Sequence, residues 1–70
     1  MNEQKIGELA GQVWKYLETH GGQAEWNTIR RQVGTFEGVP VDMGVGWLAR
    51  EGKLFFTSDG DGIRMAIRRN

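Results

Sequence analysis

The sequence from Val45 to Phe56, Val-Gly-Trp-Leu-Ala-Arg-Glu-Gly-Lys-Leu-Phe-Phe, contains the signals from which the architecture can be predicted. Its first half continues an apolar stripe with helical spacing, at positions 41, 45, 48 and 49. Gly52 follows this stripe closely, and glycine readily takes the left-handed conformation that ends many helices. Residues 54–57 then favour a strand, and the turn-forming residues 58–62 follow them. The pattern predicts a helix that stops at Gly52 and passes directly into a β-hairpin.

A first helix is predicted well before this segment, over residues 4–19. Its apolar side chains recur at i, i+3, i+4, i+7, i+8 and i+11, which are the positions of Ile6, Leu9, Ala10, Val13, Trp14 and Leu17. We expect Trp14 to be buried against the third helix. Gly7 and Gly11 weaken this helix and lie four residues apart, so we interpret them as a place where another backbone approaches closely.

The rest of the chain completes one domain over residues 1–70. Residues 23–26 are predicted to form a short strand that pairs with the hairpin, and Asn27 is predicted to cap a second helix over 28–33. Pro40 suits the start of the third helix, over about 40–51. The hairpin strands are predicted at 54–57 and 63–68. The fold class is therefore mainly α with a small antiparallel β wing: a winged helix-turn-helix of three helices, a β-hairpin and a short extra strand.

Two segments of this chain resemble a known family. They are residues 10–17, Ala-Gly-Gln-Val-Trp-Lys-Tyr-Leu, and residues 46–53, Gly-Trp-Leu-Ala-Arg-Glu-Gly-Lys. They are similar to the short bacterial and archaeal winged helix-turn-helix proteins that are catalogued as a domain of unknown function. The family typically has an acidic residue at position 52 and Ala-Leu at 44–45, where this chain has glycine and Gly-Val. The resemblance implies a DNA-binding-like architecture and no particular activity.

Composition and motifs exclude several other classes. The 70 residues include no cysteine and one histidine, so we expect neither a disulfide nor a structural metal site. No nucleophile, carboxylate pair or phosphate-binding loop is recognisable, so we predict that the protein is not an enzyme, uses no cofactor and has no evident small-molecule substrate. No apolar run is long enough for a membrane span, and no signal peptide is recognisable at the start. These features predict a cytoplasmic protein.

DNA binding is the first functional hypothesis. Nine basic and nine acidic residues cancel, but residues 30–70 carry a net charge of +2 and residues 1–29 a net charge of −2. The outward face of the predicted third helix offers one basic side chain, Arg50, and none of the Asn, Gln, Ser or Thr groups that read bases. We therefore predict phosphate contact with weak or no sequence readout, and the alternative that these bases are ordinary solvated charges stays open. The candidate DNA-binding residues are Arg30, Arg31, Arg50, Lys53, Arg64, Arg68 and Arg69.

A protein-interaction module is the alternative hypothesis. Trp47 lies beside the apolar stripe of the third helix, Met43 lies one turn before it, and Phe55 points to the opposite strand face from Leu54 and Phe56. Clustered exposed apolar groups mark interaction sites, and tryptophan is enriched in them. We therefore predict an interface that contains Met43, Trp47 and Phe55, most simply in a homodimer. The competing interpretation is that Trp47 is an ordinary core residue.

Overall fold

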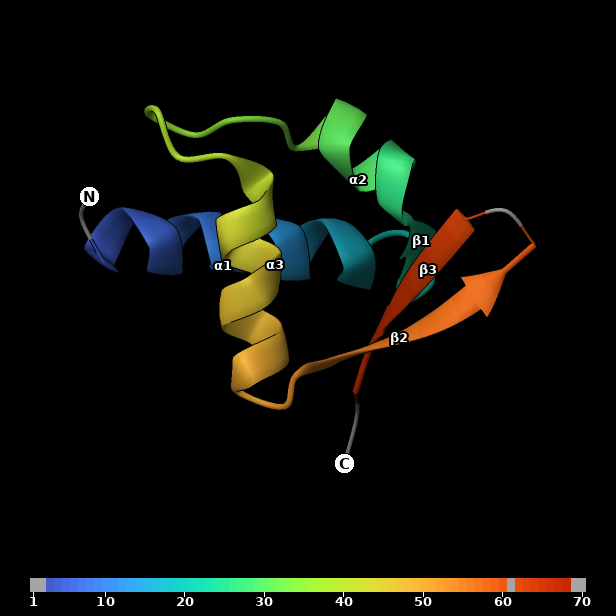
Figure 1. Ribbon diagram of the computed structural model, residues 1–70. Coiled ribbons are helices and arrows are strands. Elements are labelled where there is room, and N and C mark those ends of the chain that lie inside the picture. Colours follow the sequence, from blue (N-terminus) through green and yellow to red (C-terminus); the bar gives the residue numbers. More distant parts are fainter. Residues whose placement is uncertain (1–2, 61, 69–70) are drawn as a thin grey trace.

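The computed structural model describes residues 3–60 and 62–68 and confirms the predicted winged-helix architecture. Three helices pack together, and a small sheet extends from one side of them (Figure 1). In chain order the elements are α1 (Glu3–Glu18), β1 (Gln23–Glu25), α2 (Trp26–Gln32), α3 (Val41–Arg50), β2 (Leu54–Asp59) and β3 (Gly62–Ile67).

The three strands form an antiparallel sheet in the order β1-β3-β2, so the last strand of the chain lies in the centre. The predicted short strand is confirmed as β1, and Ala66 of β3 lies between Gln23 of β1 and Phe55 of β2. The predicted loop over 58–62 was too long. Ser58 pairs with Ile63, so the strands continue almost to the tip, where Gly60 takes a φ of +65°. Hairpins with such short connections favour turns that begin with a positive φ.

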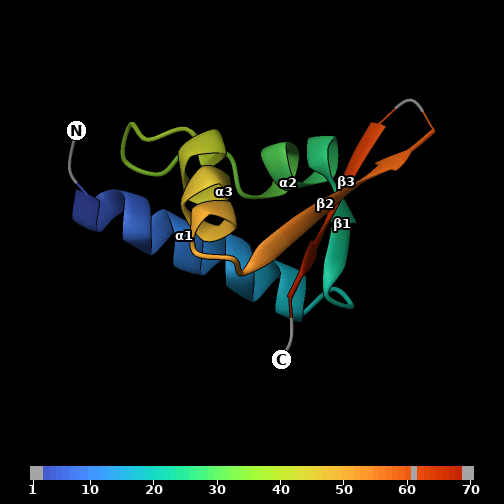
Figure 2. The ribbon, with the colours of Figure 1, turned by 60° about the horizontal axis from the view of Figure 1, so that its bottom comes forward.

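The core lies between α1, α3 and the inner face of the sheet. Its fully buried large side chains are Leu9, Val13, Leu17, Ile29 and Met65. α3 crosses α1 at close range (Figure 2). Gly44 permits this crossing, because a Cβ atom there would lie 2.9 Å from Leu9 Cγ and 3.1 Å from the backbone nitrogen of Ala10.

One prediction about α1 was wrong, and a second is confirmed only in part. A Cβ atom at Gly7 or Gly11 would meet nothing within 4 Å, so no backbone approaches α1 at these glycines. Trp14 is half-buried and lines a hollow with Trp47 and Leu48 of α3, whereas Val13 and Leu17 are fully buried in the core.

The helix ends are set by local hydrogen bonds. α2 begins at Trp26, because the Glu25 carboxylate accepts a hydrogen bond from the Asn27 N–H at 3.1 Å; the prediction of Asn27 as the cap was wrong. The predicted stop of α3 is confirmed. Gly52 has a φ of +74°, its N–H donates to the Ala49 carbonyl at 3.0 Å, and the Lys53 N–H donates to the Leu48 carbonyl at 2.9 Å. This pair of bonds is a Schellman motif.

The turn between α2 and α3 spans residues 33–40 and has a structure of its own. Phe36 and Val39 exchange two backbone hydrogen bonds, each of 2.9 Å, across Glu37 and Gly38, which have φ values of +48° and +85°. Val39 is buried, and the Lys5 Nζ lies 3.5 Å from Glu37 Oε1. The turn is therefore packed against the domain and fixes the start of α3.

Candidate nucleic-acid interface

The exposed face of α3 is the surface that a helix-turn-helix would present to DNA. Val41, Val45 and Leu48 are buried on the opposite face, so helical spacing places Asp42, Gly46 and Arg50 outward. From the N-terminal to the C-terminal end of α3, this face carries the acidic Asp42, then Gly46, which has no side chain, and then the basic Arg50. Within the described residues it has no amide or hydroxyl side chain that could read a base edge.

The acid at the start of α3 is paired with α2. Arg30 Nε lies 3.8 Å from Asp42 Oδ1, and the guanidinium lies 5.2 Å from the centre of the Trp26 ring. Both charged side chains are about half exposed, so this ion pair contributes little stability. The ion pair does hold the Arg30 guanidinium beside the Asp42 carboxylate. This neighbouring negative charge reduces the attraction of Arg30 for a phosphate. The neighbouring Arg31 is exposed, and its Nη2 donates to Thr28 Oγ1 at 3.4 Å.

A second basic group lies where α3 passes into β2. Lys53 and Arg68 are joined through their backbones, since the Arg68 N–H donates to the Lys53 carbonyl at 2.8 Å. The Lys53 Nζ lies 3.5 Å from Glu51 Oε1, and the Arg68 guanidinium lies 5.4 Å from the centre of the Phe55 ring. The Arg50 side chain, in the last turn of α3, makes no ion pair or hydrogen bond with another described residue. It is the one base on the α3 face, and no described acid is paired with it.

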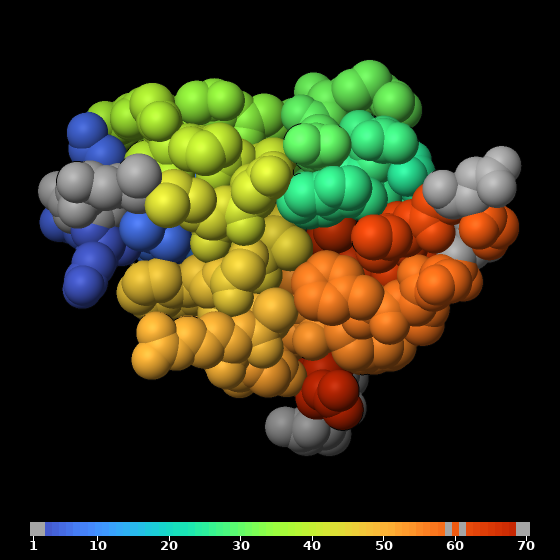
Figure 3. All heavy atoms as spheres, in the orientation of Figure 1, coloured from blue at the N-terminus to red at the C-terminus, as the bar shows by residue number. Residues whose placement is uncertain are grey.

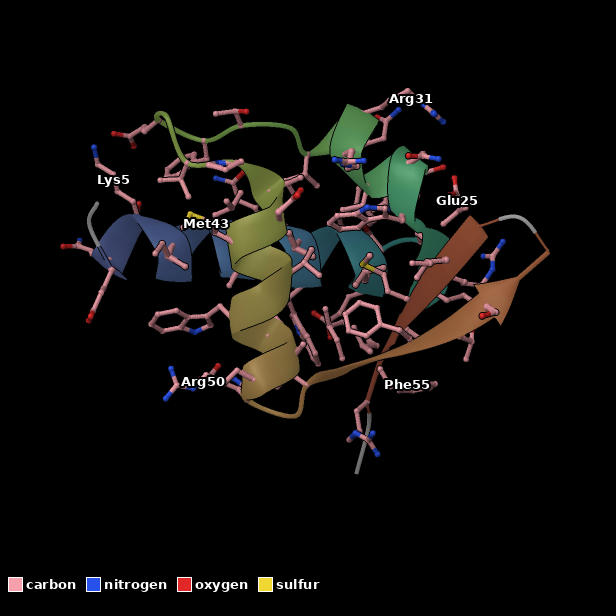
Figure 4. The ribbon with its side chains drawn as sticks, in the orientation of Figure 1. Lys5, Glu25, Arg31, Met43, Arg50 and Phe55 are labelled. Atoms are coloured by element: carbon pink, nitrogen blue, oxygen red, sulfur yellow. The ribbon has the colours of Figure 1, made fainter. Side chains whose placement is uncertain are left out.

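The structure therefore sorts the predicted basic residues into separate groups. Arg30 and Arg31 lie on α2, whereas Arg50, Lys53 and Arg68 lie near the C-terminal end of α3. The labelled side chains of Arg31 and Arg50 lie at opposite ends of the helical layer (Figure 4). Arg64 is on the sheet face that points away from the helices, opposite Glu25 and Thr57. Arg69 lies outside the described residues.

The predicted protein-interface residues do not form one patch. Met43 lies beside the first half of α3, whereas Phe55 projects from β2 on the far side of the end of α3 (Figure 4). Trp47 is half-buried against the core and lines a hollow of about 550 Å³ between α1 and α3, together with Trp14, Gly7 and Gly11. Phe55 is 40% exposed on the outer face of the sheet.

Sequence reasoning missed two exposed apolar residues on the wing. By strand alternation Phe56 shares a face with the buried Leu54 and Ile63 shares a face with the buried Met65, yet 48% and 50% of their surfaces are exposed. They do lie on the inner face, but the hairpin projects past the helices, so only its base is covered. With Trp26 and Gly46 they line an apolar hollow of about 430 Å³. Figure 3 shows the face on which α2, α3 and the hairpin meet. Alternation along a strand predicts the sheet face to which a side chain points. It does not predict how much of that face the helices cover.

Within residues 3–60 and 62–68, no group of three or more His, Asp or Glu side chains is placed to hold a metal ion. None of the described helices is long and apolar enough to cross a membrane.

Comparison with known proteins agrees with the fold. The sequence model of a family described as "Winged helix-turn-helix domain (DUF2582)" matches residues 1–66. The chain is also similar to "Uncharacterized protein MJ1608" of Methanocaldococcus jannaschii, with 41% identity over 58 residues that cover 79% of each chain. The resemblance that was based on residues 10–17 and 46–53 is thereby confirmed.

Proposed function

Because the chain belongs to the winged helix-turn-helix domain family DUF2582, we propose that it binds duplex DNA through phosphate contacts, with weak or no sequence readout. The observation that carries this proposal is the exposed face of α3. Arg50 lies free at one end of that face, and Lys53 and Arg68 lie near it. Cationic side chains in such a group position a protein on the DNA backbone without reading its sequence.

The rest of α3 supports weak readout. Helix-turn-helix proteins commonly contact bases with the N-terminal part of the second helix. Here that part carries Asp42, whose carboxylate would repel phosphate, and Gly46 follows with no side chain to reach a base. Arg31 extends the proposed contact toward α2, while Arg30 contributes less because Asp42 is beside it. Arg64 and Arg69 stay predicted members of the contact surface.

A salt titration tests this proposal directly. Binding of a fluorescent duplex of about 20 base pairs should be measurable at low salt and should weaken steeply as salt rises, because phosphate contacts release counterions. Two duplexes of unrelated sequence should bind with similar affinities. If no binding is found at low salt, or if one sequence is strongly preferred, the proposal is wrong.

A protein-interaction module is the second candidate function. The observation that favours it is the position of three exposed large apolar residues, Phe55, Phe56 and Ile63, which all lie on the β2–β3 hairpin. Phe56 and Ile63 line one hollow on the inner face of the sheet, and Phe55 lies on the outer face. Exposed large apolar groups of this kind mark interaction surfaces. Partner contact by Met43 and Trp47 stays a prediction, as do the cytoplasmic location and the lack of enzymatic activity.

A further inference from the structure

The β2 strand has one free edge. β3 pairs with it on one side, and no other described segment pairs with it on the other. The bond from Arg68 N–H to the Lys53 carbonyl identifies 53 and 68 as a hydrogen-bonded pair, and such pairs alternate along an antiparallel ladder. The backbone groups of Phe55 and Thr57 therefore face β3. Those of Leu54, Phe56 and Ser58 face away from it.

This edge lacks the usual protection against pairing. Edge strands are commonly shielded by charged residues, proline, a bulge or a covering segment. Residues 54–58 contain no charge and no proline, and the register with β3 runs without a bulge from Leu54 to Asp59. Phe55 is exposed on one face of the strand and Phe56 on the other. The opposite edge of the sheet, β1, has three residues and continues directly into α2, so it offers a much shorter ladder.

We infer that two copies of this chain associate by antiparallel pairing of β2 with β2, about a two-fold axis at Phe56. In this register all three outward residues find partners: Leu54 pairs with Ser58 of the second copy, and Phe56 pairs with its own equivalent. A shift of the axis to residue 55 or 57 leaves one of the three without a partner inside the opposite strand. The chosen register also places Lys53 opposite position 59, which is an aspartate in the sequence.

Association in this way covers the exposed aromatic residues on both faces of the strand. The two Phe56 side chains meet on the inner face, and Phe55 lies beside Thr57 of the second copy on the outer face, because residues opposite each other in a ladder point to the same side. The two sheets become one continuous sheet, and one self-complementary patch serves both subunits. The inference rests on the second candidate function and does not require DNA binding.

A proline substitution tests the pairing without touching the hairpin ladder. Ser58→Pro removes an N–H that points away from β3, so the hairpin should survive while the contact between copies is lost. Ser58→Ala is the matched control, because it keeps the N–H. By sedimentation equilibrium at tens of micromolar, without DNA, we expect dimers for the wild type and Ser58→Ala. For Ser58→Pro we expect a dissociation constant raised about tenfold or more, with an unchanged circular dichroism spectrum.

The register is tested separately by crosslinking, since the chain has no cysteine of its own. At the axis, the Cα atoms of a hydrogen-bonded pair lie about 5.5 Å apart, which suits a disulfide. Phe56→Cys should therefore form a disulfide-linked dimer on mild oxidation. Ser58→Cys should not, because the two cysteines would lie roughly 14 Å apart.

Several results would overturn the inference. They are a wild-type monomer at tens of micromolar, oligomers larger than a dimer, a Ser58→Pro dimer as stable as the wild type, or equal crosslinking of the two cysteine variants. A dimer that Trp47→Ala dissociates and Ser58→Pro leaves intact would place the interface at the α1–α3 hollow instead. None of these results bears on the DNA titration, so the two proposals fail independently.

Discussion

Gly44 and Gly46 are two residues apart in α3 and have opposite structural roles. Gly44 faces α1, where an added Cβ would approach backbone atoms at 3.1 and 3.2 Å, whereas a Cβ at Gly46 would point into open space. Gly44→Ala should therefore lower the free energy of unfolding by about 1–3 kcal/mol, because the crossing must open to admit a methyl group. Gly46→Ala, the matched control, should raise it by about 1 kcal/mol through helix propensity. Urea denaturation measures both, and equal effects of the two substitutions would contradict the assigned crossing.

Arg50 is the residue on which the DNA-binding proposal depends most. It is exposed at the end of α3 and makes no ion pair with a described residue, so its charge is available to a phosphate. Arg50→Gln should weaken binding to all duplex sequences about equally. It should also reduce the slope of log K against log salt concentration by about 1 for the lost phosphate contact. Lys15→Gln is the control for net charge, because Lys15 is exposed on α1, away from α3. If both variants change the slope equally, the effect comes from total charge and Arg50 is not at the interface.

At the scale of elements, the end of α3 sets the direction of the wing. Gly52 has a φ of +74°, and a Cβ there would meet no atom within 4 Å. Gly52→Ala should therefore destabilise the fold through backbone conformation alone, by about 1–2 kcal/mol. Gly11→Ala, in a regular helix with equally open space, should instead stabilise it by about 1 kcal/mol. Thermal melts of the two variants should shift in opposite directions, and a Gly52→Ala melt at the wild-type temperature would contradict this role for the Schellman motif.

The same elements show which features sequence could predict. The stop at Gly52, the stripe of α1 and the strand before α2 depend on neighbours in the chain, and all three were predicted close to their observed places. The helix crossing was assigned to the wrong glycines, because Gly7, Gly11 and Gly44 look alike until the distance between helices is known. The exposure of Phe56 was missed for the same reason, since the length of strand that the helices cover is a property of the packed molecule.

The candidate site was predicted less completely than the fold. The basic residues could be named from sequence, but their grouping could not, because it depends on how α2 and α3 pack. The pair formed by Arg30 and Asp42 links two elements, and it lowers the value of Arg30 as a phosphate contact. Arg50 was predicted correctly to point outward, since helical spacing alone determines its face.

At the scale of the whole molecule, the central position of β3 has a consequence for synthesis. Both other strands pair with β3, and β3 is the last element of the described chain. A ribosome adds about 5–20 residues per second. The time between synthesis of the start of β1 and the end of β3 is therefore roughly 2–9 s, and the corresponding time for β2 is roughly 1–3 s. During the shorter interval the apolar β2 segment is translated but has neither of its edges paired. The nascent chain can form α1 early, but its sheet assembles only when nearly all of the domain has left the exit tunnel.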